Sequence, residues 1–330
     1  MSRVRTEIEQ SIASRYRRFA HNEARGQSAL YEGLAEFVAE SDRMLTFLAS
    51  LPKDRQQPNL LFAAVRNVVG LPSDGKALVD AIDREGSAVS AVMKSRTTQT
   101  NEPGRCAVLL PVLARLPQPI AIVEVGASAG LCLLPDRYGY DYGRCRIEAP
   151  NETRACAPAF PSECNELTPL PRNLPDIQWR RGLDLNPLDV ASISDMEWLE
   201  TLVWPEQQGR RERLRAAIEV ARRDPPMVAR GDLLKDLETV LRQVPPGLTT
   251  VIFHTAVLAY VNERGRQQFR QAMFESGAVW ISNEAPGVFP EIASKLSFQV
   301  RHDRFLLCVD DNPVAWAAPH GQSLDWIGNG

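Results

Sequence analysis

The stretch Ile120-Ala121-Ile122-Val123-Glu124-Val125-Gly126-Ala127-Ser128-Ala129-Gly130 decides the fold. Its first six residues form a short, almost entirely apolar run, which is typical of a parallel strand buried on both faces. Gly126 and Gly130 supply the backbone freedom that a tight turn needs, and Ser128 keeps the middle of the turn small. The apolar residues 131–134 predict a helix whose first N–H groups face a ligand. The stretch therefore predicts a strand, a tight turn and a helix in succession.

Similar apolar runs recur downstream and predict further strands. They lie at 176–179, 226–229, 249–253, 278–281, 304–309 and 313–317. Helical patterns at 206–223 and 233–243 separate the earlier runs, and Asp310-Asp311-Asn312 reads as the turn of a final hairpin. This alternation predicts an α/β domain over 116–330, a Rossmann-like doubly wound sheet with a C-terminal antiparallel hairpin at one edge. Residues 135–175, rich in Pro, Arg and Cys, are expected to form an insertion.

The residues before this domain predict helices. Ile8, Ile12, Tyr16 and Phe19 recur at helical spacing, and later apolar residues repeat the pattern. No stretch before residue 115 has the alternation of a strand. We therefore expect a helical N-terminal domain over 1–115, which acts as a cap.

Composition limits the classes of partner and compartment. The 330 residues carry a net charge of −3, so no basic surface predicts a nucleic-acid partner. The charged start and the lack of a long apolar run predict a cytoplasmic protein without membrane segments. Cys145, Cys156 and Cys164 lie too far apart for the close pairs of structural zinc sites, so no metal is expected. Oligomeric state stays open.

The glycine turn resembles the first motif of class I S-adenosylmethionine-dependent methyltransferases, acid-x-Gly-x-Gly-x-Gly. Here Ser128 stands where the family has its middle glycine. The resemblance implies a methyltransferase-like fold and a site for S-adenosylmethionine. It assigns the amino-acid part of this cofactor to the turn residues Glu124, Gly126, Ala127, Ser128 and Gly130.

Two later segments extend the resemblance to the adenosyl part. Asp184, followed by Leu185, matches the acid that holds the ribose hydroxyls, with Glu148 as the alternative. A carboxylate suits this role because it accepts two hydrogen bonds from a diol. The segment Gly231-Asp232-Leu233 resembles the third motif, whose acid contacts adenine, although Asp232 also suits a helix N-cap.

Polar residues beside these motifs are candidates for the chemistry. His254 follows the fourth predicted strand and is expected to transfer a proton or orient the substrate, with Tyr260 and Glu284 as weaker catalytic candidates. The alternative for His254 is a histidine bonded to backbone at a strand end. The polar segment 96–102 is either a solvated linker or part of the substrate site, through Arg96, Gln99, Asn101 and Glu102.

The whole chain is also identified as a member of a bacterial family of unknown function, number 2332. The resemblance implies a methyltransferase-like fold with a helical N-terminal region and no assigned substrate. It rests on the segments 15–20, 57–61, 96–102, 124–131, 184–187, 203–207, 282–286 and 319–321.

Three functions follow from these patterns. The first is a methyltransferase that acts on an unidentified small molecule or a protein. The second is a serine hydrolase, because residues 126–130 also spell G-x-S-x-G, with Ser128 as nucleophile. Its acid and histidine would be Asp232 and His254, or Asp310 and His320. The third is a non-catalytic binding protein with the same fold.

Overall fold

The structure is a computed structural model, and it describes residues 5–296 and 299–328. The chain folds into two compact units, which we name the helical unit and the sheet unit. The helical unit comprises residues 1–100 and 197–211, and the sheet unit comprises 101–196 and 212–330. The first unit thus ends at residue 100, before the expected boundary at residue 115. It also includes a later segment, residues 197–211.

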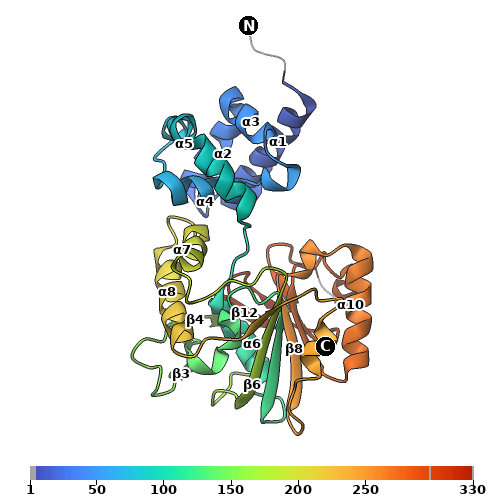
Figure 1. The fold of residues 1–330 in the computed structure, drawn as a ribbon. Helices are drawn as coiled ribbons and strands as arrows, with labels where there is room; N and C mark the ends of the chain where they lie inside the picture. The colour runs from blue at the N-terminus through green and yellow to red at the C-terminus, as the bar shows by residue number, and fades with distance from the viewer. Residues whose placement is uncertain (1–4, 297–298, 329–330) are drawn as a thin grey trace. The chain divides into compact units, whose positions relative to one another are not determined.

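The described residues up to Ser95 are mainly helical, as the apolar spacing predicted (Figure 1). Polar caps mark the helix starts. Thr6 and Glu9 form a reciprocal capping box at the first helix, and Ser28, Ser41 and Asp74 each accept an N–H at later ones. The helices are α1 (Glu7–Phe19), α2 (Ala29–Glu40), α3 (Asp42–Ala49), α4 (Pro58–Val69) and α5 (Gly75–Ser95), with a π-helical turn at Ala20–Ala24.

Two tryptophans explain why residues 197–211 belong to the helical unit. The Trp198 indole donates a hydrogen bond to the Thr97 carbonyl, and the Trp204 indole donates to Asn59 Oδ1. The Trp204 ring also packs against Phe19 and Tyr31. The division therefore runs through two helices, α7 (Ile193–Leu202) and α8 (Gln208–Arg223). No described helix is both long and apolar enough to cross a membrane.

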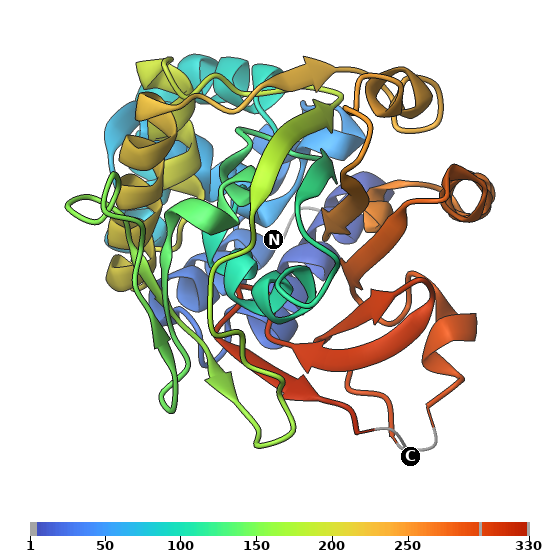
Figure 2. The same ribbon diagram turned by 90° about the horizontal axis from the view of Figure 1, so that it is seen from below.

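The sheet unit is built on a nine-stranded mixed sheet with the order β5-β12-β11-β10-β9-β8-β1-β6-β7 (Figure 2). The strands from β7 to β9 run parallel, and β10, β11 and β12 follow as antiparallel neighbours. The strands are β1 (Ile120–Val125), β5 (Glu163–Cys164), β6 (Ile177–Asp184), β7 (Val228–Arg230), β8 (Thr249–Thr255), β9 (Val279–Glu284), β10 (Phe305–Val309), β11 (Asn312–Ala317) and β12 (Ser323–Trp326).

The chain changes direction across the sheet beside its most buried strand, β1. From β1 it passes to β6 and then β7 on one side, and later to β8 and β9 on the other. The loops after β1 and β8 therefore leave in opposite directions, and the carboxyl ends beside such a point are where open α/β sheets bind ligands. All six residues of β1 are buried, as the continuous apolar run predicted.

The register separates the side chains of the parallel strands into two faces. One face carries Val123, Ile252 and Trp280 and packs against α9 (Leu237–Leu241), α10 (Glu263–Ser276) and α11 (Pro290–Ala293); we call it the α10 face. The opposite face carries Glu124 and Thr255. We call it the Arg105 face, because Arg105, just before α6 (Cys106–Leu113), bonds Thr255 there.

The helix expected after the glycine turn is absent, and this prediction was wrong. Only a single 3-10 turn forms, over Leu131–Leu133. An α-helix would need the residue 135 N–H to reach the Leu131 carbonyl, but residue 135 is proline and has none. The Leu131 carbonyl accepts from the Tyr138 hydroxyl instead, and its N–H donates to Asn101 Oδ1. Within the described residues, no α-helix therefore begins directly after the turn.

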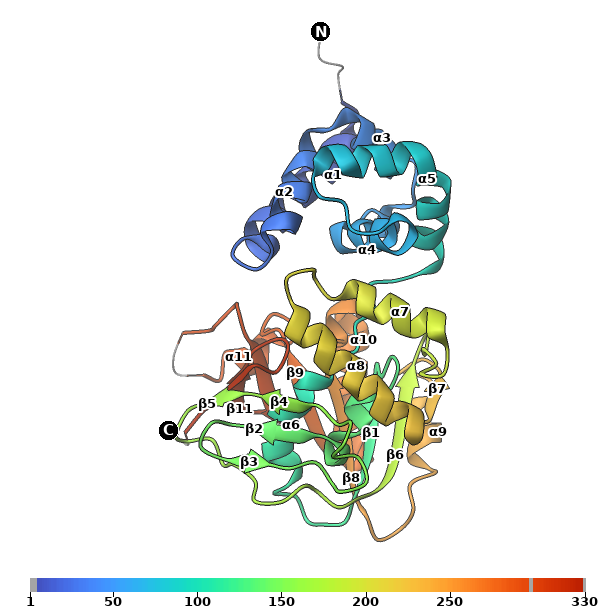
Figure 3. The ribbon, with the colours of Figure 1, turned by 90° about the vertical axis from the view of Figure 1, so that its left-hand side faces the viewer.

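The later elements match the sequence prediction in part. The predicted hairpin forms as β10 and β11, with left-handed φ values at Asp310 and Asp311. It is not the sheet edge, because β12 and β5 lie beyond it. The insertion builds a small second sheet of β2 (Gly139–Asp141), β3 (Arg146–Ile147) and β4 (Ala159–Pro161), labelled in Figure 3.

We predict that Phe269→Ala lowers the free energy of unfolding by about 3–5 kcal/mol, because it empties a fully buried site on the α10 face. Phe274→Ala is the matched control. It lies on the same helix and contacts Trp280 as Phe269 does, but it is 52% exposed. Urea unfolding measures both, and equal losses would contradict this assignment of the core.

Candidate functional site

The glycine turn is fastened to the end of β6. Gly126, Ser128 and Gly130 all have left-handed φ values, of 72°, 53° and 74°. The Ser128 N–H donates to Asp184 Oδ2 at 2.8 Å, and the Gly126 N–H donates to the Leu183 carbonyl at 2.8 Å. The other Asp184 oxygen accepts the Asn186 N–H at 2.7 Å. A single carboxylate therefore fixes the turn and the loop after β6 together.

The turn also packs closely on its protein neighbours. A Cβ added to Gly126 would lie 2.3 Å from Val257 Cγ2, in the loop after β8. A Cβ added to Gly182 would lie 2.7 Å from Ala127 Cβ. The small residues of this region therefore allow the turn to approach both neighbouring strands.

The remaining residues predicted for the adenosyl part lie at the ends of β6 and β7. The Gly231 N–H donates to the Asp184 carbonyl at 2.9 Å, and Asp232 Oδ1 accepts the Leu234 N–H at 2.8 Å. Leu185 is 68% exposed. Leu234 is also exposed, and Leu233, the residue before it, is half-buried. This end of the sheet thus offers apolar side chains and carboxylates together.

The alternative ribose residue lies elsewhere. Glu148 follows β3 in the small sheet and is exposed. Only Asp184, of the two candidates, contacts the glycine turn.

His254 lies on the α10 face with both ring nitrogens engaged. The Trp280 indole donates to His254 Nε2 at 3.0 Å, so Nδ1 carries the proton and donates to Glu284 Oε1 at 2.7 Å. The ring is fully buried. Its role in proton transfer stays a prediction, and this geometry favours a positioning role.

Glu284 organises the loop after β8. Its Oε1 atom accepts from His254, from the Val257 N–H at 2.8 Å and from the Leu258 N–H at 3.1 Å. Because Val257 packs on Gly126, this carboxylate helps to place the glycine turn. Tyr260, the third catalytic candidate, follows the loop and is 81% exposed.

Four buried polar residues form a row across the Arg105 face. They end four adjacent parallel strands, and the register puts their side chains on the same face: Asp184 on β6, Glu124 on β1, Thr255 on β8 and Asn283 on β9. We name this set the polar row. Adjacent buried polar residues at the carboxyl ends of a sheet are a costly use of core positions, which is typical of a functional site.

Arg105 closes over the polar row from the segment before α6. Its Nη1 atom donates to Thr255 Oγ1 and to the Thr255 carbonyl, and its Nε atom donates to the Pro319 carbonyl. Nearby, Glu102 Oε1 accepts the Gly104 N–H, and Glu102 Oε2 lies 3.8 Å from His320 Nδ1. Of the predicted substrate residues, Asn101 and Glu102 belong to the sheet unit and lie beside this site, and Arg96 and Gln99 belong to the helical unit.

Burial sets the protonation of Glu124. Burial raises the pKa of this carboxyl well above its usual range, and the neighbouring Cys132 and Asp184 raise the pKa further. The Arg105 guanidinium acts in the opposite direction and offsets the rise only in part. Burial therefore favours the neutral form of Glu124.

The groups of a serine hydrolase do not come together. Ser128 Oγ is buried and has no hydrogen-bond partner in the described part of the chain. Neither His254 nitrogen reaches it, because both already have partners. Asp310, in the second predicted triad, accepts the Trp280 N–H near the start of β9, at the opposite end of the sheet.

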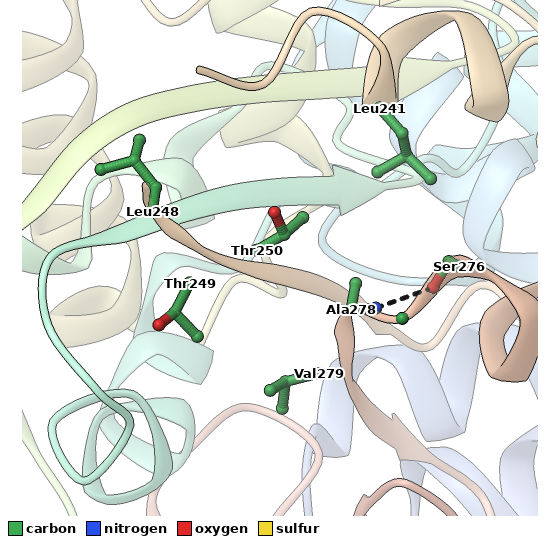
Figure 4. A pocket seen from close by; sticks show the side chains of 8 residues that line it. Leu241, Leu248, Thr249, Thr250, Ser276, Ala278 and Val279 are labelled. Atoms are coloured by element: carbon green, nitrogen blue, oxygen red, sulfur yellow. Dashed lines mark hydrogen bonds between the residues drawn. The ribbon is translucent and has the colours of Figure 1, made fainter. Parts of the chain in front are cut away.

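A hollow of about 300 Å³ lies away from these residues, at the amino ends of β8 and β9 (Figure 4). Thr249, Thr250 and Val279 line it together with the end of α10. None of the predicted site residues lies there. Within residues 5–296 and 299–328, no group of three or more His, Cys, Asp or Glu side chains is placed to share a metal ion.

We predict that Gly126→Ala destabilises the fold by more than the roughly 1–2 kcal/mol that a left-handed φ costs an alanine. The new methyl group would also collide with Val257. Gly277→Ala is the control, because Gly277 has a φ of 67° but nothing within 4 Å of an added Cβ. Thermal unfolding compares the two; equal losses would show that the turn does not pack tightly on the β8 loop.

We predict that Glu124→Gln stabilises the protein increasingly as pH rises. Below about pH 4.5 the carboxyl is protonated in the folded and unfolded chains alike, so the variant gains nothing. Above it, the unfolded carboxyl ionises while the buried one resists. The gain should grow by about 1.4 kcal/mol per pH unit until the folded carboxyl ionises. Urea unfolding across this range measures it, with exposed Glu152→Gln as control; a constant difference would contradict the raised pKa.

Sequence reasoning missed two residues of this site, Arg105 and Thr255. Arg105 stands where the polar segment meets an apolar helix, and Thr255 directly follows His254. These positions were the available signals, but only the folded structure shows that Arg105 and Thr255 meet.

Searches among curated proteins and among solved structures give no match to the chain. A family model described as an uncharacterized protein conserved in bacteria, DUF2332, matches residues 13–326. The match covers nearly all of both units. The chain therefore belongs to the DUF2332 family.

Proposed function

We propose that the chain binds S-adenosylmethionine at the carboxyl ends of β1, β6 and β7, and transfers its methyl group to a second ligand. The parallel strand order, which reverses beside β1, supports a Rossmann-like, methyltransferase-like arrangement. The glycine turn follows the first strand of this arrangement, as in class I enzymes. A cytoplasmic location and a small-molecule acceptor remain part of the proposal.

One observation carries the proposal, the bond from the Ser128 N–H to Asp184. These residues are 56 positions apart in sequence, yet the fold brings the second acid onto the glycine turn. A ligand at the turn would therefore meet a carboxylate suited to ribose hydroxyls, with exposed Leu185 beside it for the adenine ring.

The residues of the chain would act mainly by positioning. When bound, the cofactor supplies an electrophilic methyl group on a sulfonium sulfur. Methyl transfer needs the acceptor in line behind that carbon, and correct placement supplies much of the rate. Asp184 holds the turn, and Glu284 holds the loop after β8. The polar row faces the space where an acceptor group would be oriented and kept from water.

Calorimetry on the full chain tests the binding step. We expect S-adenosylmethionine and S-adenosylhomocysteine to bind with roughly micromolar dissociation constants. No binding of either ligand at high micromolar concentration would refute the proposal.

Asp232→Asn tests the adenine contact. We expect a roughly tenfold loss of affinity with little change in unfolding temperature. Asp189→Asn is the matched control, because Asp189 accepts the Ala191 N–H at 2.8 Å, two residues on, as Asp232 accepts that of Leu234. Equal affinity in all three proteins would place adenine elsewhere.

The rival hydrolase has its own test. A fluorophosphonate probe should leave Ser128 unlabelled, since its hydroxyl has no base within reach among the described residues. Labelling that disappears in Ser128→Ala would favour the hydrolase. Cofactor binding without methyl transfer to any acceptor in a screened library would favour a non-catalytic binding protein.

A further inference from the structure

Arg105 is a buried cation whose hydrogen bonds all go to neutral oxygens. The residue is only 6% exposed, and its side chain donates to two main-chain carbonyls and one hydroxyl. Among the described residues, no carboxylate lies within ion-pair distance of it. A buried cation without a counter-ion is costly, so such a group is usually paired.

Asn283 is a buried amide that lacks hydrogen-bond partners among the described residues. The residue is fully buried, and neither Nδ2 nor Oδ1 has a hydrogen-bond partner among the described residues. Asn283 pairs with Thr255 in the register of β8 and β9, so its side chain lies beside the threonine that Arg105 holds. An unpaired buried amide also costs stability, and folded proteins contain few of them.

The remaining charged groups of the polar row do not supply the missing anion. Burial raises the pKa of Glu124 and favours its neutral form. Asp184 lies on the far side of β1 from Thr255 and accepts the N–H groups of Ser128 and Asn186. The positive charge and the free amide therefore meet at the ends of β8 and β9.

We propose that a carboxylate of the methyl acceptor binds between Arg105 and Asn283. The hydrogen bonds of Arg105 use Nε and Nη1, so Nη2 is left to donate to the carboxylate. Asn283 Nδ2 can donate to the same group while Oδ1 accepts from a neighbouring hydroxyl or amine. One cation suits a monoanion better than a phosphate dianion. The acceptor is the assigned source because β8 and β9 lie across β1 from the strands proposed to hold adenosine. This assignment rests on the proposed function.

A tight backbone contact lies beside Arg105. A Cβ added to Gly321 would lie 2.0 Å from the Gly104 carbonyl oxygen, and Pro319 accepts from Arg105 Nε. The 319–321 turn is thus packed on the segment that carries Arg105. Opening of this turn would expose the site, and a bound carboxylate would gain enclosed partners when it closes.

The carboxylate site is tested without any adenosyl ligand. Thermal unfolding of the full chain is followed with acetate, succinate or glutamate, and with chloride at the same ionic strength. We expect at least one carboxylate to raise the unfolding midpoint above the chloride value. A wild-type chain that unfolds at the same temperature in all four salts would overturn the proposal.

Asn283→Asp gives a test of opposite signs. If the site needs an anion, the new carboxylate pairs with Arg105, raises the unfolding midpoint in chloride and abolishes the response to added carboxylates. If the site needs none, the variant buries a further charge and lowers the midpoint, which overturns the proposal. Asn283→Leu, which removes the amide without adding charge, should lose the carboxylate response but gain no ion pair.

Arg105→Lys keeps the charge, but a single ammonium group cannot hold the Thr255 and Pro319 oxygens and also present the donor that Nη2 supplies, so the variant should lose most of the carboxylate response. Arg266→Lys is the matched control, because Arg266 also donates to two main-chain carbonyls, those of Val261 and Val288, but lies on α10. We expect the control to keep the response. Loss of the response in both variants would attribute it to general destabilisation and overturn the assignment to Arg105.

A second comparison identifies the source of the carboxylate. S-adenosylhomocysteine carries an amino-acid carboxylate, and 5′-methylthioadenosine lacks it. If the acceptor supplies the anion, Asn283→Asp leaves the ratio of the two affinities unchanged. A roughly tenfold fall in that ratio would move the carboxylate to the cofactor and overturn the acceptor assignment. Failure of both nucleosides to bind would count against the proposed function alone, since the salt experiment does not use them.

Discussion

The bond between the Ser128 N–H and Asp184 is the interaction on which the site depends. A serine with a left-handed φ is strained, and such a residue persists only where its surroundings hold it. Asp184 does this from β6, while Val257 packs on Gly126 from the loop after β8. Contacts from the strands on both sides of β1 thus hold the turn in one conformation, so a ligand that binds the turn meets a rigid backbone.

The two faces of the sheet divide the work around this turn. On the α10 face, His254, Glu284 and Trp280 form a buried chain of hydrogen bonds that ends on the N–H groups of the β8 loop. These bonds order the backbone of the loop, although Glu284 Oε2 has no hydrogen-bond partner among the described residues. On the Arg105 face, the polar row leaves both amide atoms of Asn283 without a partner among those residues. Because the buried Arg105 cation also lies on this face, we expect the acceptor to bind there.

The sequence predicted strands well and loop geometry poorly, for a physical reason. A buried parallel strand needs a nearly continuous apolar run, and residues 120–125 form such a run. The helix expected after the turn failed because Pro135 has no N–H to bond the Leu131 carbonyl, which accepts from the Tyr138 hydroxyl instead. Asp184 was identified by its residue type after a strand, but Arg105 meets Thr255 only through packing of segments far apart in sequence.

The polar row also explains why the chain tolerates a costly core. Apolar residues at Glu124 and Asn283 would pack these strand ends without desolvating polar atoms, and proteins keep such groups chiefly where function requires them. Four of the buried polar residues gather at neighbouring strand ends. Arg105, Glu124 and Asn283 differ in what they can bind, and under the proposal above they favour a ligand that brings its own negative charge to Arg105. The fold thus carries an electrostatic deficit that an acidic ligand is suited to fill.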